Sequence, residues 1–252
     1  MKEILIKTER LSKSFSSGGS LQHVLKNIDL ELYKGDFTVI MGASGAGKST
    51  LLYALSGMDT PTLGKITFGE NVISDLDSDG LALFRKKHCG FVFQQIYLID
   101  SMSILDNVLA AGLLVNKDKK ALAEHARELF GAVGISEETI MKFPAQLSGG
   151  EAQRAGIVRA LINSPEIIFA DEPTGALNSK SGLDVLDTLT VFNNQGQSVV
   201  MVTHDMRSAR RGNRILYLSD GIVMGECNLG KYRHGDEMRH KKLSDFLTEM
   251  GW

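Results

Sequence analysis

A glycine-rich stretch at residues 42–49 carries the most specific chemical pattern in this sequence. It reads Gly-Ala-Ser-Gly-Ala-Gly-Lys-Ser and matches the phosphate-binding pattern GxxxxGK(S/T). The glycines let several backbone N–H groups point at one anion without Cβ atoms in the way. Lys48 is expected to reach the β- and γ-phosphates, and Ser49 to place its hydroxyl on Mg²⁺. The pattern therefore predicts a nucleoside triphosphate site formed by Gly42, Ala43, Ser44, Gly45, Ala46, Gly47, Lys48, Ser49 and Thr50.

The segments on either side of this stretch are the ones that a phosphate site needs. Residues 37–41 are a short apolar run of the buried-strand type, and residues 48–55 contain no Gly or Pro to stop a helix. The loop then ends at a helix N-terminus, where free N–H groups and the helix dipole favour negative charge. The alternative, an ordinary glycine-rich turn, would not require a strand before it and a helix after it.

Two carboxylates, Asp171 and Glu172, follow a second apolar run at residues 167–170. A carboxylate beside a bound nucleotide can coordinate Mg²⁺ or polarise a water molecule. Asp171 suits the first role and Glu172 the second. A structural pair is the alternative, but the position after a phosphate loop in the same sheet favours the catalytic interpretation.

A second candidate anion site begins at Ser148, Gly149 and Gly150. Ser148 is a good helix N-cap, and the two glycines expose the backbone at the start of a helix that runs toward Leu161. One ATP does not need two separate glycine-rich helix starts in one small domain. We therefore expect the second start to hold nucleotide that is bound to another copy of the chain; the alternative is a capped helix without a ligand.

These features, in this order over nearly the whole chain, resemble the nucleotide-binding subunit of ABC transporters. In that family the stretch at 147–154 corresponds to the signature motif, and two subunits hold two ATP molecules between them, head to tail. Residues 90–95 and 170–180 carry a closer likeness to the subgroup that serves lipoprotein release, macrolide export and bacitracin-type peptide resistance. The resemblance implies an ATPase that binds ATP and Mg²⁺, dimerises on ATP and serves a separate integral membrane permease.

The resemblance also implies roles for Phe15, Gln94 and His204. Phe15 corresponds to the aromatic residue that stacks on adenine, although an aromatic residue between strands can simply belong to the core. Gln94 corresponds to the glutamine of the Q-loop, whose amide oxygen can ligate Mg²⁺; an ordinary loop amide is the alternative. His204 corresponds to the switch histidine, which can bridge the γ-phosphate and the attacking water; taken alone, it would more often be structural.

Two positions depart from the family pattern. Ala152 stands where the signature usually has glutamine, which leaves the chemistry of Ser148 and the glycines unchanged. Asn178 stands where the D-loop usually has aspartate, so its hydrogen-bonding shape is kept but the negative charge is lost. The second departure bears on the tuning of hydrolysis across the dimer and not on ATP binding.

Composition limits the partners of the chain. With 252 residues, 43% of them hydrophobic, it can bury a full core without a disulfide or a structural metal. A formal charge of −2 means that the chain has no excess of positive charge with which to bind DNA or RNA, so no nucleic acid partner is expected. Cys89 and Cys227 are too few for a disulfide framework and fit a reducing cytosol. We see no secretory signal, and no apolar run is long enough to span a bilayer, so we expect a location at the cytoplasmic face of the membrane, reached through a partner.

The pattern of strands and helices predicts an α/β fold. Alternation at residues 4–8 and 28–32 indicates an antiparallel β layer, and the βαβ order of residues 166–203 indicates a mainly parallel sheet with helices, the core of a P-loop NTPase. Residues 214–218 and 222–224 form a closing hairpin around an Asp-Gly turn. We predict a single domain, 1–252, divided into an ATP-binding core at 1–94 and 165–230, an inserted helical lobe at 95–164, and a C-terminal part at 231–252.

The C-terminal part combines a basic stretch at 231–242 with an apolar helical face formed by Leu243, Phe246, Leu247 and Met250. We expect the basic stretch to be a solvated surface, with acidic lipid headgroups as the alternative contact. The apolar face is expected to pack on its own domain or, alternatively, on the second subunit.

The resulting hypothesis is an ATPase subunit that drives a membrane permease, for export or resistance to antimicrobial peptides or for extraction of a lipophilic substrate. Glu172 would activate water, His204 would assist it, and Ser148 would close on the γ-phosphate of the other subunit. The alternatives are a soluble ATPase that acts on the ribosome or DNA, which would typically carry tandem domains or long charged linkers, and a peptide-sensing module with little net transport.

Overall fold

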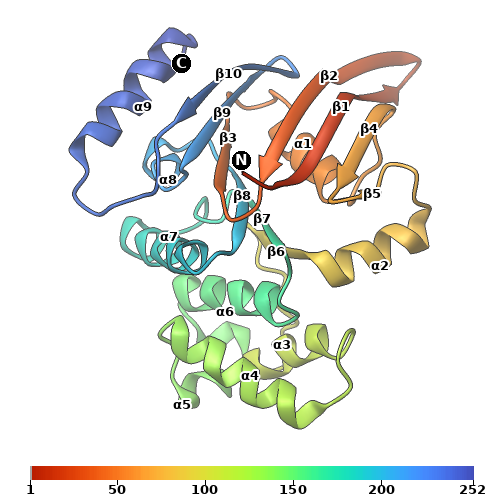
Figure 1. The fold of residues 1–252 in the computed structure, drawn as a ribbon. Helices are drawn as coiled ribbons and strands as arrows, with labels where there is room; N and C mark the ends of the chain where they lie inside the picture. The colour runs from red at the N-terminus through yellow and green to blue at the C-terminus, as the bar shows by residue number, and fades with distance from the viewer. Residues whose placement is uncertain (1) are drawn as a thin grey trace.

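We describe residues 2–252 of the protein from a computed structural model. The strands are β1 Ile4–Ser17, β2 Ser20–Tyr33, β3 Phe37–Met41, β4 Leu63–Phe68, β5 Asn71–Val72, β6 Cys89–Phe93, β7 Ile167–Asp171, β8 Ser198–Val202, β9 Arg214–Ser219 and β10 Ile222–Asn228. The helices are α1 Lys48–Leu55, α2 Ser78–His88, α3 Ile104–Gly112, α4 Lys119–Ala132, α5 Glu137–Ile140, α6 Gly149–Leu161, α7 Ser179–Asn194, α8 Met206–Ala209 and α9 Glu237–Glu249, with a 3₁₀ turn at Pro144–Gln146. Figure 1 shows how these elements are arranged.

A six-stranded sheet forms the centre of the fold, in the order β10-β9-β3-β8-β7-β6. Strands β9, β3, β8, β7 and β6 run parallel, and only β10 is antiparallel. The carboxyl ends of parallel strands meet at one edge of a sheet, where ligands bind in open α/β folds. At this edge Asp171 is in register with Phe93 on one side and with Val202 on the other, so the segments that follow β6, β7 and β8 begin side by side.

A second, antiparallel sheet has the order β2-β1-β4-β5 and confirms the predicted antiparallel layer. For the first two strands the sequence pattern indicated alternation only at 4–8 and 28–32, whereas β1 and β2 have 14 residues each and continue to a tight turn at Gly18 and Gly19. The outer half of β2 is mostly exposed, and the pairing of the two strands contains register shifts, so a regular alternation of buried and exposed residues is interrupted along the hairpin. Figure 1 shows the long hairpin beside α1.

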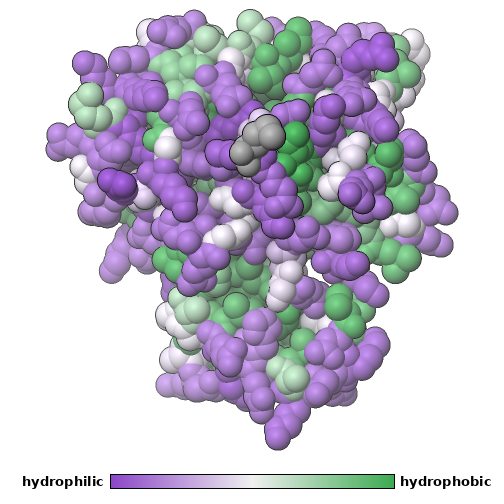
Figure 2. Space-filling model, viewed as in Figure 1, coloured by the Kyte–Doolittle hydropathy of each residue, from purple (hydrophilic) through white to green (hydrophobic). Residues whose placement is uncertain are grey.

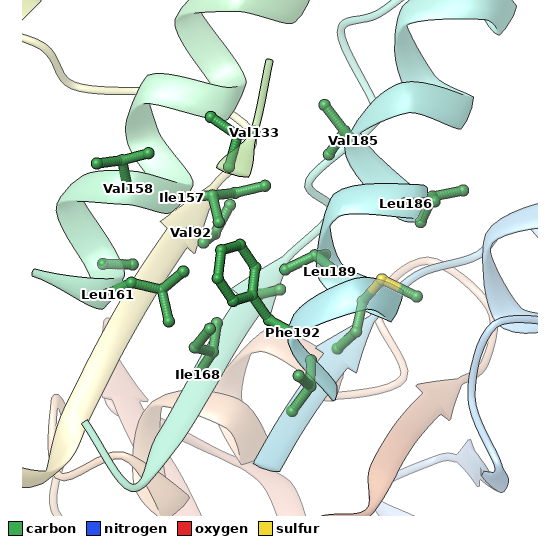
Figure 3. Close-up of a cluster of buried hydrophobic side chains, with 14 of the residues drawn as sticks. Val92, Val133, Ile157, Val158, Leu161, Ile168, Val185, Leu186, Leu189 and Phe192 are labelled. Atoms are coloured by element: carbon green, nitrogen blue, oxygen red, sulfur yellow. The ribbon is translucent and has the colours of Figure 1, made fainter. Parts of the chain in front are cut away.

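Buried side chains form two clusters on opposite faces of the six-stranded sheet. In β7, Ile168 and Ala170 belong to one cluster, while Ile167 and Phe169 belong to the other. The first cluster includes side chains of α3, α4, α6, α7 and α9, and the second lies toward α1 and the antiparallel sheet. Figure 3 shows residues of α6 and α7 facing each other beside β6 and β7. This continuous packing fixes the loops at the sheet edge.

Helices α3 to α6 gather at one end of the molecule (Figure 1). The mainly helical character of this region agrees with the sequence pattern.

Helix α2, which lies outside this region, was not predicted from the sequence. Only Leu81 and Phe84 of its residues are buried, so it lacks a clear apolar face. Its N-cap is Asp77, whose side chain accepts a hydrogen bond from the backbone N–H of Gly80 at 2.8 Å. Figure 2 shows a mainly hydrophilic surface on this face, with hydrophobic residues near the junction of the helical end and the main body.

The C-terminal helix α9 packs on its own chain, which is the first of the two arrangements that the sequence suggested. Leu243 and Leu247 are buried in the first cluster, and Phe246 and Met250 pack against it. The prediction that residues 231–242 form a solvated surface is wrong at Arg239, whose side chain is buried with 3% exposed. Its guanidinium donates to several backbone carbonyls, including those of Leu229 and Gly230 at 2.9 and 3.0 Å, and therefore anchors the helix to the preceding loop.

This packing leads to a prediction on stability. Leu247→Ala should lower the free energy of unfolding by about 2–5 kcal/mol, because it removes a buried side chain and leaves a cavity. Met238→Ala on the same helix is the control, since Met238 is 71% exposed and should have little effect. Urea unfolding followed by circular dichroism measures both. An unchanged midpoint for Leu247→Ala would mean that α9 does not contribute to the core.

Candidate nucleotide site

The phosphate loop lies between the end of β3 and the start of α1, as the sequence predicted. Gly47 is the N-cap of α1 in the left-handed conformation, with φ +99°. A Cβ atom built on Gly42 would lie 2.1 Å from the carbonyl oxygen of Leu218, so no larger residue fits there. The loop geometry thus depends on glycine at both positions.

Lys48 fills the hollow of this loop. Its ammonium group donates to the carbonyl oxygens of Gly42 and Ala43, each at 2.9 Å. The side chain is buried; burial lowers the pKa of Lys48, while the charges of Glu172 and Asp171 oppose this shift. A buried ammonium enclosed by loop backbone is the arrangement that a polyphosphate would stabilise by adding negative charge.

Asp171 lies next to Ser49, as expected for a pair that shares a metal ion. The Ser49 hydroxyl donates to Asp171 Oδ1 at 3.0 Å, and the Tyr53 hydroxyl donates to Asp171 Oδ2 at 2.8 Å. Mg²⁺ prefers oxygen ligands at about 2.0–2.1 Å in an octahedron, which places neighbouring ligand oxygens about 3 Å apart. The hydroxyl and the carboxylate therefore fit Mg²⁺ in both donor type and spacing.

Glu172 and His204 contact each other directly. His204 Nδ1 lies 2.8 Å from a carboxylate oxygen of Glu172. Glu172 has φ +46°, an uncommon conformation for a residue other than glycine and one that is frequent at functional sites. Its backbone is held on both sides, because its N–H donates to Val202 O and its carbonyl accepts from Gly175 N–H, each at 3.0 Å.

A hydrogen-bond network holds the segments after β7 and β8 together. The hydroxyls of Thr174 and Ser208 lie 3.1 Å apart, and Ser208 also donates to Asp205 at 2.8 Å. Burial would raise the pKa of Asp205, but hydrogen bonds from Ser208 and from the backbone of Arg207 outweigh it and lower that pKa. Glu172 and His204 open into a cavity of 290 Å³ beside this network. No local sequence pattern marks Thr174, Asp205 or Ser208 as supports of the site.

Gln94 lies at the same edge of the sheet, but within residues 2–252 no hydrogen bond joins it to Ser49 or Asp171. Its amide lies over the turn that follows Glu172, since a Cβ on Gly175 would be 2.8 Å from Gln94 Nε2. The exposed amide is thus one short turn away from Glu172.

The segment at Ser148 forms a capped helix start, as predicted. Ser148 Oγ accepts from Glu151 N–H at 3.3 Å, and the Glu151 carboxylate accepts from Ser148 N–H at 2.9 Å. Ser148 and Gly149 are exposed, but Gly150 is buried, and a Cβ there would lie 2.9 Å from Ser181 Cβ. Gly150 therefore has a packing role between α6 and α7 that the sequence did not reveal. In the described part of the chain, Ser148 has no hydrogen bond to the phosphate loop.

Phe15 lies on the hairpin that flanks the phosphate loop. It pairs with Gln22 and is 43% exposed, so it is not a core residue. The Lys13 ammonium lies 4.9 Å from the centre of the Phe15 ring. Further along β2, the carbonyl of Val24 would lie 3.0 Å from a Cβ on Gly47, which shows how closely β2 approaches the loop.

The fold and the loop together define a nucleotide-binding protein of the P-loop class, and comparison with known proteins identifies its family. The family model described as ABC transporter matches residues 25–175. The chain is 40% identical to an uncharacterized ABC transporter ATP-binding protein of Methanocaldococcus jannaschii, over 89% of this chain and 100% of that protein. The chain therefore belongs to the ABC transporter ATP-binding proteins and is an ATPase subunit of the ABC type.

Two further relatives bear on its function. The macrolide export ATP-binding/permease protein MacB of Escherichia coli is 41% identical over 88% of this chain, which spans 34% of MacB. The ATP-binding cassette MJ0796, solved as a dimer in a post-hydrolysis state bound to ADP and Pi, has a TM-score of 0.80 and 38% identity, and the match covers 90% of this chain and 100% of that one. No helix within residues 2–252 is both long enough and apolar enough to cross a membrane.

Proposed function

We propose that this ATPase subunit binds ATP and Mg²⁺ at the edge of the six-stranded sheet and hydrolyses ATP there through Glu172. The observation that carries the proposal is the convergence of two contacts at this edge, Ser49 with Asp171 and Glu172 with His204. The first pair is suited to the metal and the phosphates, and the second to the attacking water.

The residues of the phosphate loop, from Gly42 to Thr50, hold the triphosphate through backbone N–H groups and the N-terminus of α1. Lys48 leaves the carbonyls of Gly42 and Ala43 and donates instead to the β- and γ-phosphates. Phe15 supports the adenine by stacking, for which its exposed ring is available.

Glu172 acts as the general base, or as the group that orients water for in-line attack on the γ-phosphate. His204 contacts the Glu172 carboxylate and can donate its other ring N–H to the γ-phosphate. Mg²⁺, when bound, would neutralise charge on the phosphates. Ser49 and Asp171 would hold it, with Gln94 joining them after a movement of its exposed side chain.

A second copy of the chain completes the site in this proposal. Within one chain, the segment at Ser148 contacts Leu177 and Ser181 and leaves Ser148 and Gly149 exposed. Head-to-tail dimerisation on ATP would bring their hydroxyl and N–H groups to the γ-phosphate of the partner. The dimeric form of the similar cassette MJ0796 supports this arrangement.

We propose an integral membrane permease as the partner, which places this chain at the cytoplasmic face of the membrane. In MacB, ATP-binding and permease functions share one protein of which this chain spans about a third. We retain the division into an ATP-binding core at 1–94 and 165–230, a helical lobe at 95–164 and a C-terminal part at 231–252 as a proposal. The lobe and the Gln94 segment would carry the response to the permease.

A groove of 540 Å³ next to Gln94 supports this coupling. Phe91, Phe93 and Tyr97 contribute to its wall, and Phe93 is the neighbour of Asp171 in the sheet. Phe91 stacks on Phe93, and Tyr97 meets Phe93 edge to face. Tyr97 thus contacts Phe93 of β6, which is paired with Asp171 of β7. A partner that moved Tyr97 would therefore act on the strand next to the carboxylate proposed to bind the metal.

Tyr97→Ala should reduce the stimulation of ATPase activity by the permease roughly 10-fold, the factor expected for an aromatic contact at a protein interface, while ATP binding stays unchanged. Tyr97 is 65% exposed, so its loss should cost little stability. Met238→Ala serves as the exposed control on the opposite part of the chain. Equal stimulation of Tyr97→Ala and wild type would exclude this contact.

The transported substrate is proposed only as a class. Similarity to a macrolide export protein favours export of a lipophilic compound, including an antimicrobial peptide, or its extraction from the membrane. A peptide-sensing ATPase with little net transport is the second candidate. Action on the ribosome or on DNA is disfavoured by the net charge of −2.

Purification of the tagged chain from native membranes tests the partner. A co-purifying integral membrane protein supports the proposal, whereas ribosomal proteins or nucleic acid alone would refute it. Reconstitution of that pair then separates transport from sensing, since only a transporter moves candidate peptide across the bilayer in step with ATP hydrolysis.

A further inference from the structure

We propose that Tyr53 is a positioning residue that fixes the orientation of the Asp171 carboxylate toward Mg²⁺. The inference rests on the proposed function, in which Asp171 holds the metal. The Tyr53 hydroxyl donates to Asp171 Oδ2 at 2.8 Å, while Oδ1 faces the Ser49 hydroxyl at 3.0 Å. Each carboxylate oxygen thus has a different neighbour, and only Oδ1 points at the other expected metal ligand.

The helix α1 sets this arrangement. Ser49 and Tyr53 are four residues apart and lie on the same face, so one helix presents both hydroxyls to one carboxylate. A free carboxylate at the end of a strand can rotate about its terminal bond, because such torsions are broad. A hydrogen bond to Oδ2 restricts that rotation and keeps Oδ1 toward Ser49.

The hydroxyl of Tyr53 is the donor in this contact, because an ionised carboxylate can only accept hydrogen bonds. A donor next to a metal-binding carboxylate orients the ligand as outer-shell partners do in other metal sites.

A purely structural role for Tyr53 predicts a different set of effects. The ring packs at the margin of the cluster that contains Leu51, Leu52 and Leu55. If this packing were its whole contribution, removing the hydroxyl would leave metal binding unchanged. Tyr53→Phe keeps the ring and removes only the donor, so it separates the two roles.

The chain offers a matched control. Tyr33 also donates its hydroxyl to a carboxylate, that of Glu31, at 3.0 Å. Tyr33→Phe therefore removes the same chemical interaction on the antiparallel sheet, away from the phosphate loop. Any effect specific to Tyr53→Phe then belongs to its position beside Asp171.

The test uses Mn²⁺ in place of Mg²⁺ and the Glu172→Gln background, so that ATP stays intact. Electron paramagnetic resonance measures the Mn²⁺ concentration needed to load the ATP complex, and a fluorescent ATP analogue in EDTA measures nucleotide affinity without metal. Tyr53→Phe should require roughly 10-fold more Mn²⁺ and keep the metal-free affinity. Tyr33→Phe should match the background in both measurements.

Two results would overturn the inference: unchanged Mn²⁺ loading in Tyr53→Phe, or an equal loss of nucleotide affinity in EDTA, which would show a structural effect. Asp171→Asn, measured in parallel, distinguishes the two levels of the proposal. If Asp171→Asn loads Mn²⁺ normally, the role of Asp171 in the proposed function fails. If Asp171→Asn is impaired and Tyr53→Phe is not, only the inference on Tyr53 fails.

Discussion

Replacement of Glu172 by Gln is expected to reduce ATP turnover by roughly 100-fold or more, while ATP binding survives. The amide keeps the size of the side chain and can still accept from His204, which lies 2.8 Å away. It cannot accept a proton from the attacking water. Because the phosphate loop and the Ser49–Asp171 pair are unchanged, ATP should remain bound and the closed dimer should accumulate.

Turnover is measured by phosphate release, and binding by a fluorescent ATP analogue. Glu166→Gln is the matched control, because Glu166 precedes the opposite end of β7 and pairs there with His88 at 2.6 Å. It should hydrolyse ATP at the wild-type rate. Near-normal turnover in Glu172→Gln would refute the assignment of the base, and equal losses in both variants would point to a general effect on β7.

The parts of the site that the sequence predicted well are those in which one local pattern determines the geometry. The phosphate loop is such a case, because glycine spacing, the strand before it and the helix after it are all local. Helix α1 spans Lys48–Leu55, the stretch in which the sequence has no Gly or Pro to stop a helix. Ser49 and Asp171, each assigned to Mg²⁺ from the sequence, lie together in the structure, since parallel strands bring their carboxyl ends to one edge.

The features that were missed depend on contacts between distant segments. The Tyr53 hydroxyl reaches Asp171 across 118 positions of sequence, and only its spacing from Ser49 could have indicated it. Arg239 looked like a surface charge because its partners are backbone carbonyls, which have no side-chain signal. The buried position of Gly150 against Ser181 likewise appears only when α6 and α7 pack together.

If each ATP site is shared between two copies of the chain, a mixed dimer of two inactive variants should regain ATPase activity. Lys48→Ala removes the ammonium of the phosphate loop, and Ser148→Arg places a long cation where the partner's γ-phosphate should lie. Each variant alone should lose nearly all ATPase activity. In a mixed dimer, however, both lesions fall in the same site if the loop of one copy faces Ser148 of the other. The second site is then intact.

Random pairing of the two variants gives mixed dimers in about half of all dimers, each with one working site, so the mixture should recover about a quarter of wild-type turnover. Phosphate release and ATP retained on the dimer measure the recovery, and each variant mixed with itself is the control. If the phosphate loop and Ser148 instead served the same chain, every chain would carry a damaged site and no mixture could recover activity. Recovery would therefore establish that Ser148, which has no hydrogen bond to the loop within the described chain, acts on the nucleotide of its partner.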